Sequence, residues 1–217
     1  MPEKPIMCKT IVTVDMAERI AADYGVDTIN VLTGFKFIGE QIGFLEQKNE
    51  KSRFIFGFEE SYGYLSGSYV RDKDGVNGAF LICEMFAFYK AQGITLIEML
   101  NELYGKYGYC LCTLHSYTFE GAAGMKKMTE IMQMFRGGIP SFGEKKVIEV
   151  FDYLPGLDGL PKSDVLKFIL EDNCSVVIRP SGTEPKIKAY LSVSAENEDK
   201  AKSAEADIAA ELKKLIH

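Results

Sequence analysis

The chain has 217 residues, a formal net charge of −6 at pH 7, and a globular composition of 47% hydrophobic and 26% charged residues. This length fits one large domain or two small ones. The negative charge argues against non-specific nucleic-acid binding, which needs a basic face. A local cluster of Arg and Lys can still bind a small anion.

Cysteine usage and hydropathy predict a cytoplasmic protein. The five cysteines are odd in number and form no C-x-x-C pair, which is typical of reduced thiols. The longest apolar run, residues 79–88, is too short to span a bilayer and contains Glu84. The N-terminal segment is too polar for a signal peptide. Cys110 and Cys112 share one face of a predicted strand, and strand packing explains them better than a metal pair.

The first 108 residues alternate predicted strands with predicted helices, as an α/β layer with mainly parallel pairing requires. Asp15 is the expected N-cap of the first helix, with Glu18 three residues later, and Thr95 and Glu98 form a capping box for the last one. The helix over 77–93 is apolar on nearly every face and is predicted to be buried. The other predictions are strands at 6–14, 28–32 and 53–59 and a helix over 33–47.

From Tyr109 onward the pattern changes to successive strands with few helices. This predicts a small α+β domain with an antiparallel sheet, so we place the domain boundary near Gly108, giving domains 1–108 and 109–217. The expected strands are 109–119, 145–154, 164–179 with a hairpin about 171–173, and 186–193, and the expected helices carry apolar stripes over 125–135 and 201–215.

The connection Arg179 to Lys188, "RPSGTEPKIK", interrupts two of these strands with the components of an anion site. Arg179 can fork two N–H donors onto a phosphate, and Ser181 and Thr183 add hydroxyls. Gly182 can take a positive φ, which would let backbone N–H groups converge on the anion, while the prolines stiffen the loop. The alternative is a polar turn in which the arginine pairs with the nearby Glu184.

The segment "GFEESYGYLSGSYVRDKDG", residues 57–75, places carboxylates just beyond a strand end, where open α/β sheets bind ligands. Glu59 and Ser61 fall on one side of an extended stretch, where they can accept and donate hydrogen bonds to sugar hydroxyls. A solvated turn is the alternative. Arg71 and Lys73 can supply positive potential for a sugar phosphate, or form surface ion pairs of little energetic value.

Other chemistries find little support. The "RDKDG" stretch lacks the ligand spacing of an EF-hand, and no D-G-D-x-D-R magnesium motif occurs. His115 lies in a predicted strand without a nucleophile signature, so we interpret it as a half-buried packing residue.

Three motifs together, "TGFKFIGE", residues 57–75 and "VVIRPSGTEPKIKAYLSV", resemble the C-terminal half of the α-D-phosphohexomutases, within the bacterial phosphoglucomutase/phosphomannomutase branch. The resemblance implies a three-layer αβα domain with a mixed, mainly parallel sheet (domain 3), followed by a small α+β domain with an antiparallel, TBP-like sheet (C-terminal domain 4). It covers essentially the whole chain.

The resemblance also implies roles for individual residues. Glu59 and Ser61 match the family's sugar-binding pair, and the phosphate loop, which holds the phosphate not being transferred, is matched by Arg179, Ser181, Gly182 and Thr183. Lys9, Lys36 and Arg71 match positions near the cleft. Phe35 and Gly63 stand where some mutases have histidines, so the general acid/base is not identified in this chain.

The family's phosphoserine and its Mg²⁺ loop belong to domains 1 and 2, whose motifs are absent here. The implied parent is an isomerase that interconverts hexose 1-phosphate and hexose 6-phosphate, of glucose or mannose, through a phosphoserine and a hexose 1,6-bisphosphate. We therefore expect a fragment whose partners are the substrate and domains 1 and 2, with no catalytic residue or metal of its own and no activity alone. A phosphopentomutase relative and a non-catalytic phosphosugar-binding module remain alternatives.

Overall fold

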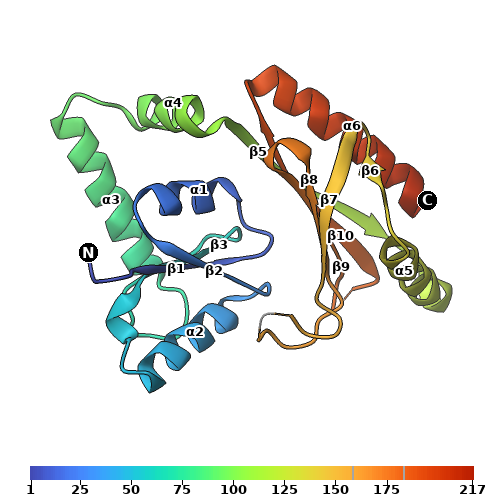
Figure 1. The fold of residues 1–217 in the computed structure, drawn as a ribbon, viewed down its shortest axis with the longest axis horizontal. Helices are drawn as coiled ribbons and strands as arrows, with labels where there is room; N and C mark the ends of the chain where they lie inside the picture. Colours follow the sequence, from blue (N-terminus) through green and yellow to red (C-terminus); the bar gives the residue numbers. More distant parts are fainter. Residues whose placement is uncertain (158, 183) are drawn as a thin grey trace. The chain divides into compact units, whose positions relative to one another are not determined.

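The computed structural model describes residues 1–157, 159–182 and 184–217, with the backbone alone at residue 122. These residues form two compact units, Met1–Tyr107 and Gly108–His217. In Figure 1 the first unit runs from blue to green and the second from green to red. Each unit has its own sheet and its own helices.

The first unit is an α/β layer structure around a four-stranded sheet of order β2-β1-β3-β4. β1 pairs in parallel with both β2 and β3, whereas β4 is antiparallel to β3. The predicted mixed, mainly parallel sheet is thus confirmed. In chain order the elements are β1 (Ile6–Thr10), α1 (Met16–Asp23), β2 (Asp27–Val31), α2 (Phe35–Gln47), the 3-10 turn η1 (Lys51–Arg53), β3 (Phe54–Glu59), β4 (Gly63–Ser66), α3 (Gly75–Ala91) and α4 (Leu96–Tyr107).

Helices lie on both faces of this sheet, with α1 and α2 on opposite sides (Figure 1). α2 buries the predicted stripe that begins with Phe35 and Ile38 and continues to Ile42 and Leu45. It approaches the sheet closely at Gly57 of β3, where an added Cβ would lie 2.7 Å from the Cγ2 atom of Ile38. Glycine at this position therefore lets helix and sheet pack together.

The start of α1 differs from the expected capping. The side chain of Asp15 makes no cap hydrogen bond to the helix. Its Oδ1 atom instead accepts a hydrogen bond from Lys9 Nζ at 3.0 Å, and Glu18 Oε1 lies 2.8 Å from the same ammonium. Asp15 is the N-cap residue as predicted, but its side chain does not cap the helix, because a buried lysine of β1 takes the carboxylate.

The capping box at α4 is confirmed, but the predicted burial of α3 is wrong. Thr95 N donates to Glu98 Oε2 at 2.7 Å, and Glu98 N donates to Thr95 Oγ1 at 3.1 Å. α3 forms as a helix with Asp74 as its N-cap, yet among its residues, all of them described, Gly78 alone is buried. An apolar sequence was correctly predicted to be helical, but this unit does not cover most of it.

Within the part of the chain that the structure describes, no single helix is long and apolar enough to cross a membrane. α3 and α4 satisfy the length and composition test only when taken together, as a pair bent by 90°.

The second unit is an antiparallel sheet of order β5-β10-β9-β8-β7-β6 with two helices, as the sequence predicts. The hairpin expected about residues 171–173 is present as a short 3-10 turn, η2. In chain order the elements are β5 (Tyr109–Thr118), α5 (Gly121–Arg136), β6 (Ser141–Phe142), β7 (Lys145–Asp152), β8 (Leu166–Leu170), η2 (Glu171–Asn173), β9 (Cys174–Pro180), β10 (Lys186–Ala195) and α6 (Glu198–Ile216).

The core of this unit lies on one face of the sheet, against α5 and α6. Alternate residues of the two central strands β9 and β10 point into it, including Ile178 and Ala189. Phe135, Phe142 and Phe168 form an aromatic cluster with ring centroids 5.2–6.3 Å apart. The residues between these core positions point to the opposite face of the sheet.

We expect Cys8 to resist modification by N-ethylmaleimide at about pH 8 while the chain is folded. The thiolate is the reactive form, and burial raises the pKa of Cys8 to about 12. The exposed Cys83 and Cys112 provide internal positive controls. Mass spectrometry of timed digests measures all three, and a Cys8 rate equal to that of Cys83 in the native chain would contradict the buried placement of β1.

Candidate functional site

The turn between β3 and β4 presents the predicted sugar-binding pair. Glu59 ends β3 and lies opposite Gly63, the first residue of β4. The Glu59 side chain is only 5% exposed, and its Oε1 atom accepts a hydrogen bond from Lys73 Nζ at 3.0 Å. That hydrogen bond is the main cause that raises the pKa of Lys73. Ser61 is exposed at the tip of the turn.

Gly63 and Phe35 lie next to this ion pair. An added Cβ at Gly63 would lie 2.6 Å from Glu59 Oε1, so the present position of Glu59 requires glycine there. The Phe35 ring, at the start of α2, has its centroid 5.9 Å from Lys73 Nζ. The sequence indicated Lys73 as a source of positive potential but not its ion pair with Glu59, because that contact depends on how a long loop folds back.

Two buried threonines hold the turn in place through hydrogen bonds to Glu60. Thr10 Oγ1 and Thr13 Oγ1 are 2.8 Å apart, and they donate to Glu60 Oε2 at 3.2 and 3.3 Å. Thr10 ends β1 as Glu59 ends β3, and parallel strands end at the same edge of a sheet. Glu60 is exposed, but these two hydrogen bonds fix its carboxylate at the end of β1, whereas Glu59 is buried beside Lys73 and Ser61 is open to solvent.

The three expected cleft cations lie in different environments. Lys9 is 0% exposed, and its ammonium contacts two carboxylates and donates to the Thr13 carbonyl at 3.0 Å. Lys36 is exposed on the first turn of α2, with its Nζ 4.8 Å from the centroid of the Phe37 ring. Arg71 is exposed and forms an ion pair with Glu46 of α2. Lys9 therefore serves the fold of unit 1, whereas Lys36 remains open to solvent.

The predicted phosphate loop joins β9 to β10 at the end of the two strands. Ser181 N donates to the Lys186 carbonyl at 2.7 Å, which closes the base of the loop. Gly182 is exposed and its φ lies outside the left-handed region, so the positive φ expected there was wrong. Apart from its chain neighbours, none of the described residues has an atom within 4 Å of an added Cβ at Gly182. The fourth predicted loop residue, Thr183, lies outside the described residues.

The side chain of Arg179 contacts an aromatic residue and not Glu184, the partner that the alternative interpretation requires. Its Nη2 atom donates to the Tyr190 hydroxyl at 3.2 Å, and its guanidinium carbon lies 5.7 Å from the centroid of that ring. Arg179 Nε is buried and has no hydrogen-bond partner among the described residues. Glu184 forms its ion pair with Lys186 at 2.8 Å instead. A donor on Arg179 is therefore unsatisfied within the described part of the chain.

A second cation lies directly across the ladder from Arg179. Lys188 of β10 is the register partner of Arg179, and the flanking pair of Ile178 and Ala189 belongs to the core. By alternation, Arg179 and Lys188 point to the same face, away from the core. Like charges directly opposite one another destabilise a sheet, so this pair favours an anion between them. The pairing of Lys188 with Arg179 follows from the strand register, which the sequence analysis does not predict.

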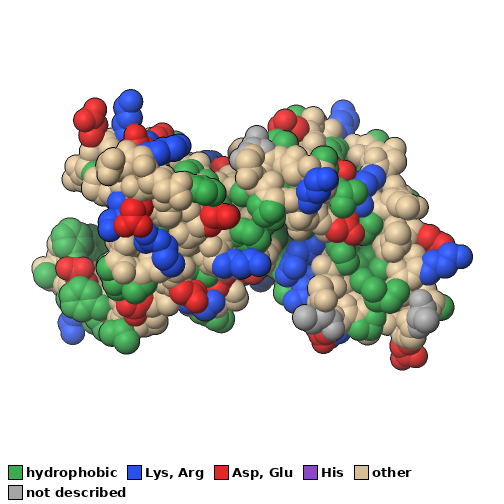
Figure 2. All heavy atoms as spheres, turned by 90° about the horizontal axis from the view of Figure 1, so that it is seen from below, with side chains coloured by type: hydrophobic (Ala, Val, Ile, Leu, Met, Phe, Trp, Pro, Cys, Tyr) green, Lys and Arg blue, Asp and Glu red, His purple; other side chains and the backbone are tan. Residues whose placement is uncertain are grey.

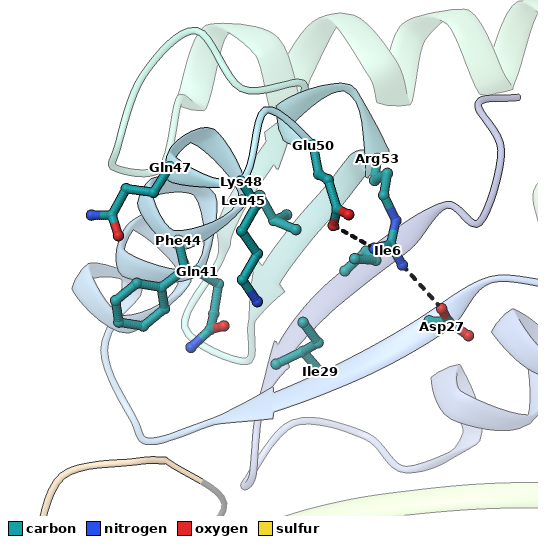
Figure 3. Close-up of a pocket in the computed structure, with 10 residues that line it drawn as sticks. All are labelled: Ile6, Asp27, Ile29, Gln41, Phe44, Leu45, Gln47, Lys48, Glu50 and Arg53. Atoms are coloured by element: carbon teal, nitrogen blue, oxygen red, sulfur yellow. Dashed lines mark hydrogen bonds and ion pairs between the residues drawn. The ribbon is translucent and has the colours of Figure 1, made fainter.

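A cavity of about 500 Å³ opens beside α2 in unit 1 (Figure 3). Arg53 crosses it, with ion pairs to Glu50 at 2.7 Å and to Asp27 at 3.4 Å, and Phe44 and Lys48 line the opposite side. None of the predicted site residues lines this cavity. It has no part in the function proposed below.

Metal binding was tested on the donor groups themselves. Over residues 1–157, 159–182 and 184–217, no three His, Cys, Asp or Glu side chains come together as a metal site would require. The described residues therefore do not fit a Mg²⁺ site.

Comparisons with known proteins match both units. Residues 2–107 match "Phosphoglucomutase/phosphomannomutase, alpha/beta/alpha domain III", and residues 120–212 match the C-terminal domain of the same family. The chain belongs to the phosphoglucomutase/phosphomannomutase family, of which it contains domain III and the C-terminal domain.

Relatives include phosphoglucomutases of Staphylococcus saprophyticus, 39% identical over 205 residues, and of Staphylococcus aureus, 39% identical over 206 residues. Each match covers 89% of this chain but only 37% of the relative's length.

Solved structures share the fold. Parafusin (phosphoglucomutase) of Paramecium has a TM-score of 0.70 at 20% identity, over 96% of this chain and 37% of its own. A phosphoglucomutase/phosphomannomutase family protein of Burkholderia thailandensis has a TM-score of 0.61 at 13% identity, over 97% of this chain and 38% of its own.

Proposed function

We propose that this chain is the substrate-binding half of a phosphohexomutase that interconverts hexose 1-phosphate and hexose 6-phosphate. The observation that carries the proposal is the opposed pair of Arg179 and Lys188 beside an open loop, in a chain of this family. The Staphylococcus relatives named phosphoglucomutase favour glucose over pentose phosphates as substrate.

The second unit would hold the phosphate that is not transferred. The buried Nε–H of Arg179 has no partner among the described residues, and the guanidinium is oriented by Tyr190. Lys188 adds a second positive charge, and Ser181 can add a hydroxyl from the loop. Charge-assisted hydrogen bonds of this kind are about twice as strong as neutral ones. Anchoring the remote phosphate lets the same site serve either end of the sugar.

The first unit would hold the sugar through its hydroxyls. The Glu59 carboxylate is fixed by Lys73 and accepts from hydroxyls, and Ser61 can donate or accept. Lys73, kept protonated by its raised pKa, can donate a hydrogen bond to a sugar or phosphate oxygen. The chemistry would come from the phosphoserine and Mg²⁺ of domains 1 and 2 in the longer mutase, with hexose 1,6-bisphosphate as intermediate.

A chimera provides the direct test. This chain would replace the matching C-terminal part of the Staphylococcus saprophyticus phosphoglucomutase, and both the chimera and the isolated chain would be assayed. With Mg²⁺, glucose 1,6-bisphosphate and glucose 1-phosphate, we expect turnover by the chimera and none by the isolated chain. Mannose, glucosamine and ribose phosphates define the sugar. An inactive, folded chimera would favour the non-catalytic phosphosugar-binding module, and a preference for ribose phosphate would favour the phosphopentomutase.

Tyr62 provides a prediction about the sugar turn. It has a left-handed φ of 63° and is 86% exposed, although a tyrosine is strained in that conformation. Tyr62→Asn is expected to raise the free energy of unfolding by about 1 kcal/mol, because Asn tolerates this backbone. The same variant should bind hexose phosphate more weakly, since the exposed ring offers an apolar face to the sugar.

Urea unfolding and ligand titration measure the two effects of Tyr62→Asn separately. In the ligand titration, Tyr69→Asn, at another exposed tyrosine of unit 1, controls for loss of an aromatic ring; it is no control for stability, because the Tyr69 hydroxyl donates to Asp74 at 2.7 Å. A loss of stability in Tyr62→Asn would contradict the described turn, and unchanged affinity would remove Tyr62 from the site.

A further inference from the structure

Most of α3 is both apolar and exposed. Its exposed large hydrophobic side chains, called here the α3 apolar surface, are Val76, Phe80, Ile82, Met85, Phe86 and Phe88. Figure 2 shows hydrophobic side chains gathered at the left end of the view, the end at which α3 lies in Figure 1. Exposed apolar patches of this kind normally mark an interaction site rather than plain surface.

One end of α3 is firmly attached to unit 1. Asp74 caps the helix by accepting from the backbone N–H groups of Val76 and Asn77. Gly78 packs on Tyr64, where an added Cβ would lie 3.3 Å from the tyrosine Cβ. The helix is thus held rigidly at its N-terminal end, and it presents the remaining turns without cover from the described part of this unit.

Two apolar cavities extend this surface over the sheet. One, of about 310 Å³, lies between β3 and α3 and is lined by Phe56, Tyr64 and Met85, among others. The other, of about 350 Å³, is lined by Phe56, Phe58 and the residues Met1, Met7, Ala17, Ile20, Ala21, Tyr24, Val26 and Ile55. Phe56 lines both cavities, so they are neighbours, one lined by residues of α1 and the other by residues of α3.

We propose that the α3 apolar surface and the two adjoining cavities bind the part of the longer mutase that precedes domain III. This inference rests on the proposed function. The relatives have most of their length outside the match, and the C-terminal domain is already present at residues 120–212. Met1 lines the second cavity, so in a longer mutase the residues joined to it would leave from the rim of this surface.

The low charge of the surface favours a protein partner within the same polypeptide. Glu84 and Lys90 are the charged residues of α3. Binding to an anionic membrane needs clustered basic residues, which this surface lacks. An interface made within one polypeptide needs no steering charges, since the linker already holds the two parts together.

Two native thiols make the test possible without mutation. Cys83 is exposed on α3, and Cys112 is exposed on β5 of unit 2. Both the isolated chain and the chimera would be treated with N-ethylmaleimide, and mass spectrometry would give the rate at each cysteine. We expect Cys83 to react at least about tenfold more slowly in the chimera, because burial excludes the reagent. Cys112 is expected to react at similar rates in both.

Several outcomes would overturn the proposal. Equal Cys83 rates in the chimera and the isolated chain would show that nothing in the longer protein covers α3. A slow Cys83 in the isolated chain that speeds up on dilution would make a second copy the occupant. If phosphatidylcholine vesicles protect Cys83 in the isolated chain, the α3 apolar surface binds lipid instead.

Activity of the same chimera separates this proposal from the function. An active chimera with a fast Cys83 would refute the interface and leave the mutase function standing. An inactive chimera with a slow Cys83 would support the interface and refute the mutase function.

A matched pair of substitutions gives an independent measurement. Phe80 and Ile148 are 64% and 66% exposed, in unit 1 and unit 2 respectively. Phe80→Asp and Ile148→Asp should both leave the melting temperature of the isolated chain nearly unchanged. In the chimera, Phe80→Asp alone should lower the melting temperature and release Cys83. Equal effects of the two variants in the chimera would contradict the proposal.

Discussion

Arg179→Ala in the chimera is expected to weaken binding of hexose phosphate by roughly 2–5 kcal/mol, as for loss of a buried charge-assisted contact. Arg179 has a buried Nε atom without a partner among the described residues and faces Lys188 across the ladder, so its removal takes away the oriented donor and leaves Lys188 alone with the anion. The effect should appear as a raised KM for glucose 1-phosphate.

Two further variants define what Arg179 does. Arg179→Lys should recover only part of the loss, because a lysine keeps the charge but not the planar fork of donors. Lys213→Ala, at an exposed lysine of α6, controls for a simple change in net charge. An Arg179→Ala enzyme with the same KM as the unmodified chimera would remove this loop from the substrate site.

Lys9→Met should lower the free energy of unfolding of unit 1 by about 2–4 kcal/mol, somewhat less than for a fully buried pair. Its wholly buried ammonium neutralises Asp15 and Glu18, whose side chains are 23% and 36% exposed. Removing the cation leaves two carboxylates close together without the positive charge that neutralises them, although Glu18 keeps its hydrogen bond from Asn30 Nδ2 at 3.1 Å. Methionine fills most of the lysine's volume, so the loss is electrostatic rather than a cavity.

Lys51→Met is the matched control for Lys9→Met, since Lys51 pairs with Glu46 while 45% exposed. Exposed pairs contribute about 0–1 kcal/mol. Urea unfolding of the two variants of the isolated chain compares them. Equal losses would contradict a structural role for Lys9, and a Lys9→Met chain of normal stability would return this residue to the list of cleft cations.

Much of the fold was predictable because each unit follows local rules. The apolar stripe of α2 and the capping box of Thr95 and Glu98 are encoded within a few residues, and the structure has both. The antiparallel strands of the second unit follow from alternation and turn residues. These signals need no knowledge of distant contacts.

The mistaken predictions for the side chain of Asp15 and for the burial of α3 depend on contacts between distant parts of the chain. Asp15 has the sequence of a helix cap, but Lys9 of the neighbouring strand takes its carboxylate. α3 has the composition of a core helix, but composition does not say which surface covers it. Lys73 reaches Glu59 only because the loop before α3 returns to the end of β3.

Residue-resolved NMR of this chain tests the proposed phosphate-binding and sugar-binding sites together. The chain would be titrated with inorganic phosphate, glucose and glucose 6-phosphate. Phosphate alone should shift the amide signals of the Arg179–Lys188 segment, and glucose alone those of the Glu59–Gly63 turn. Glucose 6-phosphate should shift both, and Arg179→Ala should abolish the first set. Signals that move in neither segment with glucose 6-phosphate would contradict a phosphosugar-binding role for this half of the enzyme.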